Sequence, residues 1–139
     1  MLLILAAGCA MQGRSQKLDA SKVPGPVKDG FAKQYPKVSK VKWEMENGQY
    51  EATFKLDGNS MSTLQDASGK ITETETEIKA ADLPAAVKSY VGEHYKGHSI
   101  REAAKIIKAD GSINYEAEVK EKNLVFDSNG KFIKEEKED

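Results

Sequence analysis

Apolar and polar residues alternate along much of this chain, which is the pattern of strands whose two faces meet different environments. In residues 41–46, Val, Trp and Met alternate with Lys and Glu. An Asn-Gly pair, the strongest short hairpin signal, then leads into a second alternating stretch at residues 50–56. Turn-forming Asp, Gly, Asn and Ser residues precede two more stretches, 61–65 and 71–78. The pattern predicts four consecutive antiparallel strands.

The last of these stretches, "ITETETEI" at residues 71–78, has three interpretations: a disordered acidic tract, a metal-binding run, or a strand with two different faces. Disorder does not require strict alternation or an Ile at each end. A metal-binding row is disfavoured because alternate strand residues lie about 6.6 Å apart, too far for neighbouring carboxylates to close easily on one calcium ion. We therefore predict a strand with Thr on one face and Glu on a solvated face.

The chain contains an internal repeat of about 60 residues. "VPGPVKDGFAKQY" at 23–35 matches "LPAAVKSYVGEHY" at 83–95, and "YEA" at 50–52 matches "YEA" at 115–117. The turn "DASGK" at 66–70 corresponds to "DSNGK" further along. Three blocks kept in the same order indicate two copies of one structural unit.

A helix is predicted at the start of each repeat. In the second repeat, Asp82 precedes the helix as a candidate capping residue and Gly97 follows it as a candidate stop. In the first repeat Pro36 ends the helix. The apolar stripes recur at three- and four-residue spacing and comprise Leu83, Val87, Tyr90, Val91, His94 and Tyr95 in one helix and Val27, Phe31 and Tyr35 in the other.

The second repeat predicts further strands on both sides of Asp110-Gly111, then "NLVF", and a short last strand at Phe132, with the tail "KEEKED" frayed and solvated. The fold class is therefore α+β. It is a tandem repeat of a helix plus a four-stranded antiparallel sheet, joined into one sheet with both helices on one face. The expected boundaries are 21–78 for the first unit and 79–139 for the second, within one shared domain.

Residues 1–20 are interpreted as a signal remnant and tether. "MLLILAAGC" resembles the end of a bacterial lipoprotein signal, in which an apolar run and small residues precede a lipid-modified cysteine, here Cys9. The alternative is a disordered start with a free thiol. The run is too short to span a bilayer, which needs about 20 apolar residues. The expected location is the bacterial cell envelope, as a periplasmic or outer-membrane lipoprotein.

Charge and motif content exclude several function classes. Lys plus Arg number 21 against 22 Asp plus Glu, so no net basic charge favours nucleic acid. The two histidines, His94 and His98, are separated by a helix-breaking glycine and are too few for a zinc site. The Asp-Gly stretches suit turns better than calcium loops. We expect no catalytic residue, no metal and no cofactor.

The remaining candidate for a functional site is the face of the predicted sheet that points away from the helices. Trp43, Tyr50 and Tyr115 lie on the opposite, core side. At strand spacing the face measures on the order of 38 by 20 Å, near the roughly 800 Å² per partner of a standard interface. It either binds a protein or peptide partner or simply faces water. Its predicted residues, mixed in charge, are Lys42, Glu44, Glu51, Thr53, Lys55, Glu116, Glu118 and Lys120.

The "LP..V...V...Y" pattern and the "YEA" blocks resemble the PepSY-like, β-lactamase-inhibitor-like family of secreted and lipid-anchored bacterial proteins, over residues 21–136. The resemblance implies a tandem α+β fold, an envelope location and no catalytic role. The expected function is a non-enzymatic envelope binding module that holds a protein or peptide partner on its open sheet face. The family name refers to β-lactamase inhibitors, which bind enzymes through such a face, but this chain lacks their cysteine pairs. The alternatives are a small-ligand sensor or carrier, with its site between helix and sheet, and a protease or enzyme inhibitor.

Overall fold

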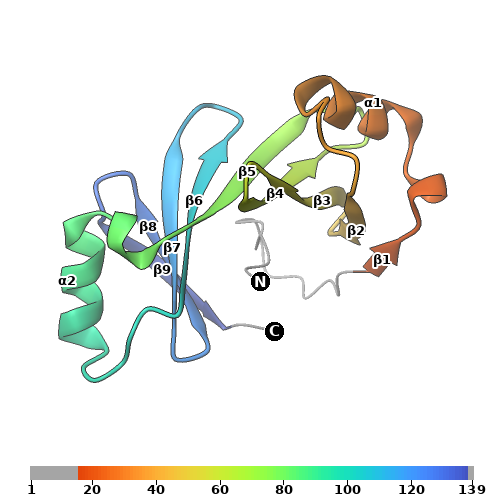
Figure 1. The fold of residues 1–139 in the computed structure, drawn as a ribbon. Helices are drawn as coiled ribbons and strands as arrows, with labels where there is room; N and C mark the ends of the chain where they lie inside the picture. Colours follow the sequence, from red (N-terminus) through yellow and green to blue (C-terminus); the bar gives the residue numbers. More distant parts are fainter. Residues whose placement is uncertain (1–15, 138–139) are drawn as a thin grey trace. The chain divides into compact units, whose positions relative to one another are not determined.

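The computed structural model describes residues 16–137 and, within them, two compact units that divide between Glu75 and Thr76. Each unit has one α-helix, preceded by a short 3-10 helix (Figure 1). The helices are η1 (Ala20–Lys22), α1 (Gly25–Gln34), η2 (Ala80–Asp82) and α2 (Ala85–His94). The strands are β1 (Gln16–Leu18), β2 (Lys42–Glu46), β3 (Gln49–Leu56), β4 (Asn59–Gln65), β5 (Ile71–Ile78), β6 (Glu102–Lys108), β7 (Ile113–Val119), β8 (Lys122–Asp127) and β9 (Phe132–Lys137).

The strands described for residues 16–137 form a nine-stranded sheet in sequence order, β1 to β9, and the printed pairings are antiparallel. This confirms the α+β class and the predicted helix-plus-strands repeat. The predicted strand at 71–78 is also confirmed, with the same bounds. It lies between β4 and β6 in the strand order.

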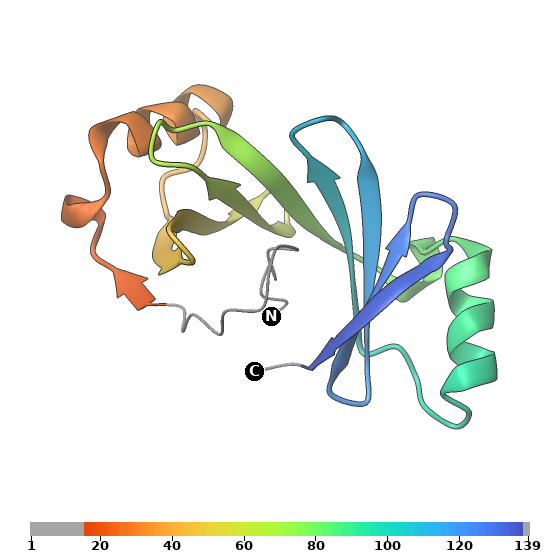
Figure 2. The same cartoon turned by 180° about the vertical axis from the view of Figure 1, so that it is seen from behind.

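Two predicted irregular segments are in fact strands. Residues 16–18, predicted as part of the tether, form β1, the red strand at the start of the described chain in Figure 2. They pair with Trp43, Glu44 and Met45 of β2. The C-terminal tail was also predicted wrongly, because β9 continues to Lys137. Its charged residues gave no apolar alternation, but they pair along β8, where Asn123 lies opposite Glu136.

In the first unit α1 covers one face of the strands. Val27 and Phe31 of α1 pack with Trp43, Ala52 and Phe54 of the strands, and all five are buried. Phe31 makes edge-on ring contacts with Trp43 and Phe54, with centroids 5.5 and 5.0 Å apart. The predicted apolar stripe of this helix is therefore its core-facing side, and Tyr50 lies partly buried against the same cluster.

The second unit repeats this arrangement with different residues. Val87 and Val91 of α2 pack against Ala117, Leu124 and Phe126. Tyr90 stacks on Phe132 with centroids 4.6 Å apart and meets Phe126 edge-on, and Tyr115 lies at the margin of the cluster. Both units thus bury the helix stripe on the same side of their strands as the apolar strand residues.

The helix starts differ from prediction in one detail. Both α1 and α2 begin directly after a proline, Pro24 or Pro84, and neither receives a side-chain capping bond. Asp82 lies in η2 and does not cap α2. A side-chain cap does form at η1, where the Asp19 carboxylate accepts from the Ser21 amide at 2.9 Å. Proline needs no amide partner at a helix start, which explains why the missing cap is tolerated.

Candidate functional site

The candidate binding face is the side of the strands opposite the helix in each unit. The antiparallel registers establish which residues share it, because directly paired residues point to the same side of a sheet. In the first unit Lys42 is paired with Thr53, and Glu44 is paired with Glu51. Trp43, on the intervening position, points into the helix-side core. The register therefore places the predicted residues of this unit on one face.

Exposure divides that group. Lys42 and Lys55 are exposed, and Glu44 and Thr53 are half-buried. Glu51 is only 2% exposed, which contradicts its predicted place on a solvated surface. It lies on β3 between Glu44 of β2 and Leu64 of β4, so neighbouring strands flank it on both sides. A central strand position is more easily covered than an edge position.

The second unit shows the same correction more strongly. Glu116 and Glu118 are 2% and 1% exposed, so neither is a solvated face residue. The Glu118 carboxylate lies 3.3 Å from the guanidinium of Arg101, whose own side chain is exposed. An opposite charge of this kind offsets part of the cost of burying a carboxylate. Lys120 is exposed, but it lies in the turn after β7 and not on the strand.

The sequence analysis missed a row of polar residues that crosses the strands of the second unit. Glu102 of β6 pairs with Glu118, Glu118 with Asn123 of β8, and Asn123 with Glu136 of β9. Asn123 is 2% exposed. Direct pairing puts the four side chains on one face. The hairpin turns set this register, but a prediction that ends the last strand near Phe132 leaves Glu136 in the frayed tail and misses the row.

The predicted β5 face also differs from expectation. Glu75 is 4% exposed, whereas Glu73 is half-buried and Glu77 is exposed. On the Thr side, the Thr72 hydroxyl donates to the Leu64 carbonyl at 3.3 Å. The strand assignment for 71–78 is correct, but its glutamates do not form a uniformly solvated row.

A second polar cluster joins the end of α2 to the last strand. The Tyr95 hydroxyl donates to the Glu135 carboxylate, and the Lys122 ammonium donates to the same carboxylate at 3.2 Å. The bond to Glu135 raises the pKa of Tyr95 to about 12. The bonds from Tyr95 and Lys122 lower the pKa of Glu135. All three side chains are at the surface. The Tyr95–Glu135 hydrogen bond links the residue that ends α2 to strand β9.

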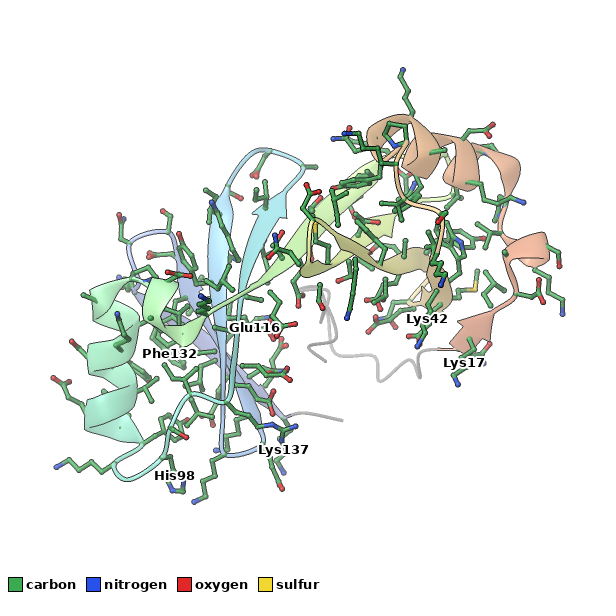
Figure 3. All side chains as sticks on the ribbon, in the orientation of Figure 1. Lys17, Lys42, His98, Glu116, Phe132 and Lys137 are labelled. Atoms are coloured by element: carbon green, nitrogen blue, oxygen red, sulfur yellow. The ribbon has the colours of Figure 1, made fainter. Side chains whose placement is uncertain are left out.

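Metal coordination has no candidate in the described part of the chain. Among residues 16–137, no group of three or more His, Cys, Asp or Glu side chains is arranged to hold a metal ion. His94 stacks on Tyr90 with ring centroids 4.0 Å apart, and His98 is exposed near it in sequence (Figure 3). The two residues show no shared ligand geometry.

The aspartates that resemble calcium ligands have a local role. Asp66 accepts from the Ser68 amide at 2.9 Å and the Lys70 amide at 3.1 Å, and hydrogen bonding by Ser68 lowers its pKa. Asp127 accepts from the Asn129 and Lys131 amides in the matching turn. These carboxylates organise their own turns, as the turn interpretation predicted.

Membrane crossing by a helix is likewise not seen: between Gln16 and Lys137 the structure has no helix with the length and apolar character needed to span a bilayer. Residues 1–15, which include the predicted lipidation site Cys9, lie outside the described residues.

Comparison with solved structures shows the same fold elsewhere. A "putative periplasmic" protein from Bacteroides eggerthii matches with a TM-score of 0.75 at 15% identity, covering 83% of this chain and 88% of that one. A "BLIP-like" protein from Bacteroides fragilis matches with a TM-score of 0.65 at 24% identity, covering 82% and 85%. No curated protein matches the sequence.

The sequence also matches a protein-family model twice. The model is described as "Putative beta-lactamase-inhibitor-like, PepSY-like", and it matches residues 9–71 and again residues 64–134. Two successive matches agree with the internal repeat and with the helix and strands found in each unit. The chain therefore belongs to the PepSY-like, β-lactamase-inhibitor-like family, as a tandem of two family units.

Proposed function

We propose that this protein is a non-enzymatic module of the bacterial envelope that binds a protein or peptide partner on the face of its strands opposite the helices. Family membership supports the non-enzymatic part, because the family is described as "beta-lactamase-inhibitor-like". The function is binding. The partner is a polypeptide in the envelope, and no nucleic acid or cofactor is involved.

The observation that carries the proposal is the chemical contrast between the two faces of the first unit. One face is closed by α1 over buried aromatic side chains. The other has polar residues with both charge signs, and its exposed or half-exposed members include Thr53 and Lys55 of β3. Polar groups of mixed sign give orientation and specificity to a protein partner.

The burial of Glu51, Glu116 and Glu118 changes which residues a partner can reach. Contact with an incoming protein falls on exposed positions such as Lys55, because the buried glutamates present almost no surface. Substituting a buried glutamate would therefore test folding as much as binding, and Lys55 is the better probe.

The proposed location is the periplasmic side of the envelope, as a periplasmic or outer-membrane lipoprotein anchored through Cys9. The apolar run ending in "AAGC" motivates the anchor. The "putative periplasmic" relative from Bacteroides eggerthii, which has the same fold, supports the compartment.

The test is affinity capture from envelope extract with the soluble part of the chain, from Gln12, as bait. Lys55→Glu reverses a charge on the proposed face. The control Lys28→Glu makes the same reversal at an exposed position of α1. A protein retained by the unmodified bait and by Lys28→Glu, but lost with Lys55→Glu, would support the face and identify the partner.

Equal retention by all three baits would place binding elsewhere on the chain. Retention of no specific protein would contradict the proposal. If the captured protein is an enzyme, its activity with and without added chain distinguishes inhibition from simple binding.

A further inference from the structure

Exposed lysines gather at the edge of the first unit where β1 pairs with β2. Lys17 lies opposite Glu44, and Lys42 is two residues from Glu44 on the same face. Such diagonal neighbours are about 7–8 Å apart. Lys40 precedes Lys42 by two residues, so their Cα atoms lie within about 7 Å. All three lysines are exposed, and two of them, Lys17 and Lys42, can be seen in Figure 3. We call Lys17, Lys40 and Lys42 the basic edge.

The charge of the first unit is unevenly distributed along the chain. Residues 16–42 contain seven lysines against two aspartates, whereas residues 43–75 contain two lysines against seven acidic residues. All seven lysines of 16–42 are exposed. Glu44, directly opposite Lys17, and the nearby Asp19 offset part of this positive charge, but the three lysines of the basic edge outnumber these two carboxylates. The basic edge therefore presents net positive charge to its surroundings.

The distance from Cys9 to this edge is short. Seven peptide units separate Cys9 from Gln16, the first residue of β1. Even a fully extended chain of that length spans no more than about 25 Å. A lipid on Cys9 would hold the start of β1 within that distance of the bilayer. Lys17, the second residue of β1, therefore stays close to the attachment point of the tether.

We propose that the basic edge is a docking site for the anionic phospholipid head groups of the membrane in which Cys9 is anchored. This inference rests on the proposed lipidation of Cys9. The ammonium groups of Lys17, Lys40 and Lys42 contact lipid phosphates once the tether has brought them close. A lysine near an anionic surface favours the bound state by about fivefold, so three favour the docked state by about a hundredfold.

Two features of the sequence make the docking measurable on the full chain. Cys9 is the single cysteine and can be coupled to a maleimide head-group lipid in vesicles, which supplies an anchor at the natural position. Trp43 is the single tryptophan, lies next to Lys42 and pairs with Leu18 of β1. Energy transfer from Trp43 to a dansyl-labelled lipid therefore reports how near the basic edge is to the bilayer.

We expect higher transfer on vesicles that contain phosphatidylglycerol than on vesicles of phosphatidylcholine alone. Raising the salt to about 1 M, where the Debye length falls to about 3 Å, should remove the difference. The triple variant Lys17→Gln, Lys40→Gln, Lys42→Gln should show the same low transfer on both vesicles. The control triple Lys88→Gln, Lys96→Gln, Lys131→Gln removes three exposed lysines from the second unit and should behave like the wild type.

Equal transfer on the two vesicle types for the wild-type chain would overturn the docking proposal, and so would an equal loss in the two triple variants. Circular dichroism of each variant verifies the fold. Membrane fractionation of cells that express the wild type or Cys9→Ala tests the anchor separately. A wild-type chain that stays soluble would overturn anchoring and the docking that depends on it, whereas a flat vesicle response overturns docking alone.

Discussion

The side-chain amide of Gln65 donates to the carbonyl oxygen of Val27 at 2.9 Å, joining the end of β4 to the first turns of α1. The same amide nitrogen donates to the Gly69 carbonyl at 3.0 Å. Gln65 is completely buried. In the second repeat the matching position is Phe126, which fills this space with a ring. The first unit therefore uses a hydrogen-bonded residue where the second uses an aromatic one.

Replacing Gln65 with alanine should lower the free energy of unfolding by about 2–4 kcal/mol, because it removes two hydrogen bonds and leaves a cavity. Urea unfolding followed by Trp43 fluorescence measures this in the first unit, to which Trp43 belongs. Gln34→Ala, at an exposed position of α1, is the matched control and should be nearly neutral. Similar losses in both variants would argue against a special role for Gln65.

The two helix glycines should respond in opposite ways to alanine. A Cβ at Gly30 would lie 2.4 Å from the Gly69 carbonyl oxygen, whereas a Cβ at Gly92 would meet no atom within 4 Å. Gly92→Ala should raise the free energy of unfolding by about 0.5–1 kcal/mol through helix propensity. Gly30→Ala should lower it by about 1–3 kcal/mol, since backbone must move. Thermal unfolding of both variants checks the prediction, which a gain in both would refute.

The turn between β7 and β8 can be improved. Lys120 and Glu121 both have positive φ, 51° and 59°. The equivalent turn of the first repeat has Asp57 and Gly58 in the same left-handed conformation. Because non-glycine residues adopt it at a cost, Lys120→Asn with Glu121→Gly should raise the free energy of unfolding by about 1–2 kcal/mol. Differential scanning calorimetry measures the gain, and an unchanged melting temperature would contradict it.

The contribution of the Tyr95–Glu135 bond should depend on pH at both ends of the scale. The bond raises the pKa of Tyr95 to about 12, so its contribution is complete below pH 10 and declines as the pH rises from 10 to 12. Glu135 has a lowered pKa, so its contribution is present above about pH 4.5 and is lost as the pH falls through the lowered value. The stability difference between wild type and Tyr95→Phe should therefore form a plateau between these limits.

Urea unfolding of both proteins across this pH range tests the plateau. A difference that stays constant from acid to alkaline pH would mean that the phenol ring, and not the hydroxyl's bond to Glu135, accounts for the effect of the substitution.

Helices, turns and most strands could be predicted from the sequence because their signals are local. The Asn47-Gly48 turn has positive φ at both residues, as its sequence indicates, and the stripe of α2 buries Val87 and Val91. The charged strand residues 134–137 carry no such signal. Their strand conformation depends on pairing with β8, which local alternation does not report.

Alternation indicates the direction of strand residues on the candidate face but not their exposure, and it does not apply to Lys120, which lies in a turn. Alternation tells which side of a strand Glu51 occupies, and the register with Glu44 agrees. Alternation does not tell how much of that side is covered, since cover comes from residues distant in sequence. The burial of Glu118 could not be predicted from alternation either. Its ion-pair partner Arg101 lies 17 positions earlier in the sequence, directly before β6.

The division between the two compact units lies inside a strand and not in a loop. Ile71 to Glu75 belong to the first unit, whereas Ile78, on the same strand, packs against the core of the second. A repeat excised at this seam would lose part of β5, so neither half of the duplication is a self-contained building block. Insertions should be tolerated at the Asp57-Gly58 turn but not between residues 71 and 78, where they would interrupt a strand that contributes residues to both units.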